Sequence, residues 1–219
     1  IIISSITFFI FFNDSPPGKK LSPITVFEGI KTALKSKNSW FASLAVFTAL
    51  SGMVSFIGAL PSGLNEIYDI PMAKGGQITS LITYLGIVGS LTLPVLANKW
   101  RKRKIFIIFL PILFSVIIFI SWLNAHINLV IWFGAILAGY FAGGTIPILM
   151  EVPTFLYRLE NEPVKKQHVG GASGMLTSLM NLGGFAGLSF IVMPVIINFG
   201  YTMGFLVAGI LFASQAFFG

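Results

Sequence analysis

Six long apolar stretches dominate this sequence, and they constrain its fold more than any other feature. They cover residues 40–60, 77–97, 105–123, 127–150, 171–196 and 201–219. Each is close to the roughly 20 residues that an α-helix needs to cross the hydrocarbon core of a bilayer. Because lipid offers no hydrogen bonds, every backbone N–H and C=O must be paired within its segment, so we expect six transmembrane helices. The runs lack the alternation that is typical of the strands of a membrane barrel.

The composition agrees with lipid as the natural solvent of this chain. Charged residues make up 10% of it, against about 25% in an ordinary soluble domain. Hydrophobic residues reach 55% and the mean hydropathy is +0.89. The net charge of +7 would suit a nucleic-acid binder, but the cations lie in short connections between apolar runs, so we expect no nucleic-acid partner. The chain has no cysteine, which excludes disulfides and thiolate metal sites.

The basic residues are distributed very unevenly between the two sides of the predicted membrane domain. Thirteen of the 14 Lys and Arg residues lie in three alternate connections, 13–39, 98–104 and 151–170. The other set of connections holds Lys74 alone. Cytoplasmic connections carry an excess of Lys and Arg, so we expect the first set, including the long connection 13–39, to be cytoplasmic. The same asymmetry supports the count of six spans, since a missed span would scramble it.

The first 39 residues differ from the rest of the chain. Residues 1–12 are apolar but too few to cross a bilayer, so we interpret them as the truncated end of a preceding transmembrane helix. Residues 13–39 are rich in Pro, Ser and Lys, and we interpret them as a cytoplasmic loop with a short helix near residues 25–35. Residues 40–219 then form the six-helix membrane domain.

A truncated helix, a long basic loop and six spans together resemble the carboxyl-terminal half of a major facilitator superfamily transporter, from the end of helix 6 through the central loop to helices 7–12. Residues 13–20 resemble the start of that loop, and residues 28–40 resemble the run into the seventh helix. The resemblance implies an all-α bundle of two inverted three-helix repeats, half of a twelve-helix transporter. It also implies a missing amino-terminal half as a partner, with substrate bound between the halves.

A weak copy of this family's loop motif lies between the second and third spans. The motif reads Gly, three residues, Asp, Arg, any residue, Gly and two basic residues, and its alignment here begins at Pro94. Its characteristic positions are filled by Asn98, Lys99, Lys102 and Arg103. Arg101 stands in place of the second glycine, and the amide of Asn98 replaces the acidic side chain. By resemblance, these residues are candidates for a conformational role, and a topology-setting basic turn explains them about as well.

No acidic or basic residue lies well inside a span, and this absence limits the chemistry that the chain can perform. Charges within a bilayer are costly and usually mark ion pathways. Glu151, at the cytoplasmic end of the fourth span, is the one candidate for ion coupling. His126 and His168 lie in opposite connections and cannot share a site, so we expect no metal, no cofactor and no catalytic residue. An intramembrane enzyme would need a His, Asp or Glu cluster within the spans.

Polar residues within the spans are the remaining candidates for a substrate cavity. They are Asn181, Thr177, Tyr84, Tyr140 and Ser51. Asn181 is the strongest, because about 1.5 Å of rise per residue places it near the membrane midplane, where an unpaired amide is expensive. An interhelical hydrogen bond is an equally simple explanation of its presence. Small residues four apart, such as Gly139 with Gly143 and Gly170 with Gly174, indicate close helix packing.

These observations predict a secondary transporter in the cell membrane that moves a small solute by alternating access. A coupling ion is a further candidate partner, and the lipid bilayer is the expected surroundings. The alternative is a six-helix membrane scaffold or assembly protein without transport activity. The sequence does not distinguish substrates, although the lack of buried charge favours a neutral or amphipathic solute.

Overall fold

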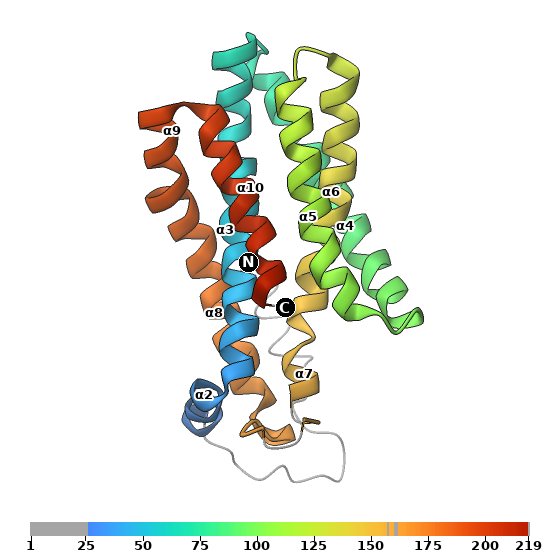
Figure 1. Cartoon of the computed structure of the whole chain (residues 1–219), viewed down its shortest axis with the longest axis vertical. Helices are drawn as coiled ribbons and strands as arrows, with labels where there is room; N and C mark the ends of the chain where they lie inside the picture. The colour runs from blue at the N-terminus through green and yellow to red at the C-terminus, as the bar shows by residue number, and fades with distance from the viewer. Residues whose placement is uncertain (1–25, 157, 160–161, 219) are drawn as a thin grey trace, which may run out of the picture.

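The computed structural model describes residues 26–156, 158–159 and 162–218 (Figure 1). Six of its helical stretches are long and apolar enough to cross a membrane. They cover Lys37–Tyr68, Met72–Lys99, Arg103–Leu123, Asn128–Leu156, Lys166–Phe199 and Tyr201–Phe218. The six predicted spans are therefore confirmed. The predicted helix end at 1–12 and the first part of the predicted loop lie outside the described residues.

The elements follow one another with short connections. In chain order they are α2 (Val26–Lys35), α3 (Lys37–Tyr68), α4 (Met72–Lys99), α5 (Arg103–Leu123), α6 (Asn128–Met150), α7 (Pro153–Leu156), η1 (Lys166–His168), α8 (Val169–Ala186), η2 (Gly187–Val192), α9 (Met193–Phe199) and α10 (Tyr201–Phe218). The short helix predicted near 25–35 is present as α2.

Helix α3 is longer at both ends than its apolar stretch. It starts at Lys37, where Ser36 Oγ accepts a hydrogen bond from the Ser39 N–H, and it runs through Pro61 to Tyr68. Asp69 ends it with a left-handed φ of 52°, and its N–H bonds the Leu64 carbonyl. Lipid sets the minimum length of a span but not the maximum, so the helix extends into the predicted connection at 61–76.

The fifth span is continuous but irregular. A π-helical turn, η2, joins α8 to α9 and ends two residues before Pro194. Proline cannot donate to the helix ladder and its ring crowds the preceding turn, so a wider turn at this point accommodates it. Gly200, with φ of 84°, ends α9 in a conformation that favours glycine, and α10 follows at once.

The helix packing has an internal symmetry. Helix α3 packs against α8 and α10, and α6 packs in the same way against α4 and α5, while α5 also packs on α10. Exchanging α3–α4–α5 with α6–α8–α10 maps these contacts onto one another. Because each set has three spans, the second set runs through the membrane in the opposite direction. This is the arrangement of two inverted three-helix repeats, as predicted.

Glycines allow the closest crossings in both repeats. A Cβ added to Gly139 of α6 would lie 2.3 Å from the Ile82 carbonyl oxygen of α4. A Cβ added to Gly183 of α8 would lie 2.3 Å from the Phe47 carbonyl oxygen of α3. Close packing at these small residues is confirmed. The prediction was wrong for Gly170 and Gly174, because nothing lies within 4 Å of the position of a Cβ at either residue.

Candidate functional site

The turn between α4 and α5 contains the motif-like segment and is strongly basic. Asn98 lies in the last turn of α4, and Arg103 is the first residue of α5. Arg101, which stands where the motif has glycine, has a left-handed φ of 54°. The turn therefore needs the conformation that a glycine adopts without strain, and an arginine adopts it at a cost of about 1 kcal/mol.

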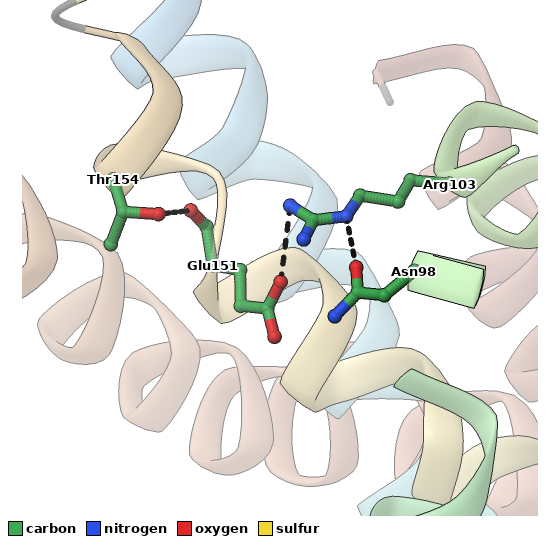
Figure 2. A network of polar contacts seen from close by, with 4 residues as sticks. All are labelled: Asn98, Arg103, Glu151 and Thr154. Atoms are coloured by element: carbon green, nitrogen blue, oxygen red, sulfur yellow. Dashed lines mark hydrogen bonds and ion pairs between the residues drawn. The ribbon is translucent and has the colours of Figure 1, made fainter. Parts of the chain in front are cut away.

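Arg103 joins three helices through its guanidinium group (Figure 2). Its Nε donates a hydrogen bond to Asn98 Oδ1 on α4. Its Nη1 lies 3.2 Å from Glu151 Oε2, at the carboxyl end of α6. The contact between α5 and α6 also joins the two three-helix repeats. We refer to Asn98, Arg103 and Glu151 together as the charged latch.

Two residues that follow α6 support the latch. Thr154 Oγ1 donates to the Glu151 carbonyl oxygen at 2.6 Å. The ring of Phe155 lies 4.1 Å from Arg103 Cζ and 5.4 Å from Arg158 Cζ, measured to its centroid. A cation over an aromatic face contributes roughly 0.5–1 kcal/mol at an exposed position. The aromatic ring therefore adds a favourable contact to the guanidinium group that reaches both partners.

The latch is only partly shielded from water. The side chains of Arg103 and Glu151 are 33% and 37% exposed. Ion pairs with this much solvent contact contribute about 1 kcal/mol or less, because water and salt screen them. A contact of this strength can open and close during a conformational change.

The motif residues predicted from the sequence therefore separate into two groups. Asn98 and Arg103 meet in the latch, and Glu151 joins them from α6. Lys99 and Lys102 are exposed and lie outside this network. Sequence reasoning named Glu151 for ion coupling and did not pair it with Arg103. Phe155 was missed, since an aromatic residue after a span carries no distinctive signal.

Of the cavity candidates on α3 and α8, one is already engaged. Ser51 is buried, and its Oγ lies 2.7 Å from the Phe47 carbonyl oxygen and 2.8 Å from the Gly183 carbonyl oxygen. Its hydroxyl therefore fastens α3 to α8. Thr177 Oγ1 donates to the Ser173 carbonyl of its own helix at 3.0 Å. Asn181 is exposed on the outer face of α8.

The other two cavity candidates lie on α4 and α6. Tyr84 is 67% exposed and lines an open groove with Gln77, Ser80 and Trp132. Tyr140 is half-buried, and its hydroxyl accepts a hydrogen bond from Thr92 Oγ1 at 3.1 Å. Among the described residues, no recorded contact joins these tyrosines to the candidates on α8. The structure thus places the five residues in two separate regions.

Metal ligands are not clustered in the part of the chain that the structure describes. No group of three or more His, Asp or Glu residues there lies close enough to hold an ion.

An all-helical bundle of six membrane-crossing helices, with a polar latch at one end, defines a multi-pass membrane protein. The sequence model of the Major Facilitator Superfamily matches residues 1–188, and the chain therefore belongs to this superfamily of transporters, whose members are not enzymes. No curated protein matches the chain closely enough to be reported as a relative. The six spans fit one half of a transporter of this superfamily.

Proposed function

We propose that this chain forms one half of a secondary transporter that moves a small solute across the cell membrane by alternating access. The observation that carries the proposal is the charged latch. It connects the two three-helix repeats at one end through a contact of about 1 kcal/mol. A contact this weak can close when the transporter faces one side and open when it faces the other. A second six-helix half would complete the transporter.

The latch also bears on ion coupling. Glu151 pairs with Arg103 in the latch. We therefore assign Glu151 primarily to the latch. The second possibility is that its carboxylate binds a coupling ion. The two roles differ in outcome, since Glu151→Gln would abolish ion dependence in the second case and only change rates in the first.

The substrate cavity is proposed to lie along the exposed polar faces of α8 and α4. Asn181 is the central candidate, because an amide facing lipid near mid-membrane has no partner for its hydrogen bonds. Tyr84, exposed on α4, would line the same surface if the second half covers both helices. Thr177 and Tyr140 are less available, since each already makes a hydrogen bond, and Ser51 would support the cavity from behind.

Cysteine labelling tests this assignment directly, because the natural chain has no cysteine. Asn181→Cys should react with a water-soluble, charged thiol reagent if it faces a hydrated cavity. Val116→Cys is the matched control, since it lies at a similar depth in α5 and is 49% exposed. Equal, slow labelling of both positions would place Asn181 against lipid and remove it from the site.

The sidedness of the membrane domain is proposed from the basic connections. The loop 13–39 and the α4–α5 turn would face the cytoplasm. Glu66 lies near the carboxyl end of α3, at the far end of that helix from the loop 13–39. Glu66→Cys should therefore be labelled from outside intact cells, whereas Lys165→Cys should be labelled only in permeabilised cells. The reverse pattern would invert the proposed orientation.

A further inference from the structure

Most serine and threonine hydroxyls within the spans bond a carbonyl of their own helix, and Ser121 of α5 is an exception. Thr92, Ser115 and Thr145 each donate to a carbonyl four residues earlier. Ser121 is 7% exposed, yet its Oγ makes no hydrogen bond to any described residue. An unpaired hydroxyl in apolar surroundings is unfavourable, so this group is available to a partner from outside the described chain.

A glycine on α6 makes room for this hydroxyl. Ser121 Oγ lies against Gly134, at the position that a Cβ of that residue would occupy. With a larger residue at position 134, the serine side chain would have to turn away from α6, toward the backbone of its own helix. The hydroxyl therefore points across to the neighbouring helix.

Ser121 and Gly134 form the floor of a groove between α5 and α6, which pack against each other. The groove has a volume of about 560 Å³ and opens at the surface of the bundle. Its walls are apolar and half-buried or exposed, and they consist of Ile117, Ile120, Leu129, Val130, Phe133 and Leu137. A concave apolar site with a single polar group is typical of sites for small amphipathic ligands.

The groove lies within one leaflet of the membrane. Ser121 is two residues before Leu123, the last residue of α5, which corresponds to about 3 Å along the helix axis. The lining residues of α6 run from Leu129 to Leu137, which is about 12 Å, against roughly 15 Å for the hydrocarbon core of one leaflet. The groove therefore extends from the membrane surface opposite the charged latch toward the midplane, and its hydroxyl lies near that surface.

We propose that this groove binds a flat, fused-ring lipid with a single hydroxyl group, as sterols have, and that the lipid hydroxyl bonds Ser121 Oγ. A sterol carries one polar group at one end of a rigid apolar body, which matches one hydroxyl near the surface and an apolar wall below it. A rigid ligand also loses less conformational entropy on binding than a flexible acyl chain does.

A bound sterol would have a structural consequence. Helices α5 and α6 belong to different three-helix repeats, so the lipid would bridge the repeats at the end of the bundle opposite the latch. The inference depends on the membrane setting of the chain and not on the identity of a transported solute.

A second groove on α5 provides the matched control. It lies between α5 and α10, has a volume of about 250 Å³ and is lined in part by Ser115. Ser115 Oγ lies 2.8 Å from the Pro111 carbonyl oxygen and 2.7 Å from the Gly209 carbonyl oxygen. Its hydroxyl is therefore already paired within the protein and has no need of a lipid partner.

Photolabelling of the full chain in phosphatidylcholine vesicles tests the proposal, with a diazirine derivative of cholesterol as the probe and cholesterol as the competitor. We expect labelling within residues 117–137 that cholesterol displaces. In Ser121→Ala, the affinity for cholesterol should fall roughly fivefold, which is the contribution of one neutral hydrogen bond. In Ser115→Ala, it should change by less than about twofold, because that hydroxyl is paired within the protein.

A second measurement needs no variant. Cholesteryl methyl ether lacks the hydroxyl proton, so the wild-type protein should bind it roughly fivefold more weakly than cholesterol. Ser121→Ala should bind the two compounds equally.

Four results would overturn the proposal. Labelling that cholesterol does not displace would indicate ordinary contact with the bilayer. Equal losses of affinity in Ser121→Ala and Ser115→Ala would separate binding from the unpaired hydroxyl. Displacement of the probe by diacylglycerol as effectively as by cholesterol would make a glycerolipid the ligand. Equal affinity of the wild-type protein for cholesterol and its methyl ether would also contradict the proposal, whether or not the variants fold.

Discussion

The side chains that join the helices differ between the two ends of the bundle. At the end where α3 and α5 finish and α10 begins, Trp122 is buried, with its indole Nε1 donating to Thr202 Oγ1 at 3.1 Å. Tyr68 donates to the Trp122 carbonyl oxygen at 2.6 Å, and the ring of Phe205 lies 4.4 Å from that of Trp122, between centroids. At the opposite end, one of the contacts between the repeats is the half-exposed charged latch.

If the proposed alternating access holds, this difference predicts which end opens. The aromatic contact combines buried surface, edge-to-face ring geometry and two hydrogen bonds, and each ring pair adds about 0.5–1.5 kcal/mol to its packing. The latch contributes about 1 kcal/mol or less. In the proposed mechanism, the aromatic end would be a fixed joint among α3, α5 and α10, and the charged end would be the reversible contact between the two repeats.

The largest effect is expected at the fixed joint. Trp122→Ala should lower the free energy of unfolding by about 3 kcal/mol, because it leaves a cavity and an unpaired Thr202 hydroxyl. An SDS titration in mixed micelles measures this loss. Trp100→Ala is the matched control at the charged end, where the ring is 56% exposed, and should cost less than about 1 kcal/mol. Equal losses would remove the distinction between the two ends.

The comparison also assumes that the middle of the bundle is rigid. Gly139→Ala places a methyl group against the Ile82 carbonyl oxygen, so we expect a loss of about 2 kcal/mol as α4 and α6 are forced apart. Gly174→Ala is the control, because its side chain would enter open space, and it should be neutral or slightly stabilising. If both variants had the same stability, the α4–α6 crossing would be looser than the structure indicates.

A smaller effect is expected at the latch. A double-mutant cycle with Arg103→Gln and Glu151→Gln should give a coupling free energy of about 1 kcal/mol that decreases as salt concentration rises. Thermal unfolding at low and high salt measures it. A coupling several times larger, or one that salt does not change, would show that the pair is buried in the assembled protein and is not a reversible contact.

The smallest effect on stability is expected for Asn181→Leu. The side chain is exposed in the described chain, so its loss should change the free energy of unfolding by less than about 0.5 kcal/mol. A cavity role predicts that solute affinity changes while stability does not. Lower stability with unchanged affinity in the surviving protein would assign Asn181 to packing.

The parts of this fold that lipid dictates could be predicted from the sequence, and the parts that packing dictates could not. Six spans follow from apolar length, and the symmetric glycine crossings follow from small residues four apart. The extension of α3 past Pro61 was missed, because a helix in the polar membrane surface no longer needs apolar residues. The π-helical turn η2 has no sequence signature other than the proline that follows it.

The candidate site shows the same limit. Arg103 and Glu151 were both named from the sequence, but their contact depends on how α5 meets α6, which no local pattern encodes. Ser51 was named as a cavity candidate because it is polar, whereas the structure engages its hydroxyl between α3 and α8. Residue type thus indicated where polar groups lie, and only the packing showed which partners they have.

Distance measurements between spin labels test the central claim most directly, that the charged end opens while the aromatic end stays closed. One pair of introduced cysteines, at Val95 (65% exposed) and Leu159 (52% exposed), reports on the charged end. A second pair, at Ile67 (48% exposed) and Met203 (50% exposed), reports on the aromatic end. In the Glu151→Gln background, we predict that the Val95–Leu159 distances become longer or broader while the Ile67–Met203 distances do not change. Unchanged distances in both pairs, or a change confined to the aromatic end, would contradict the account.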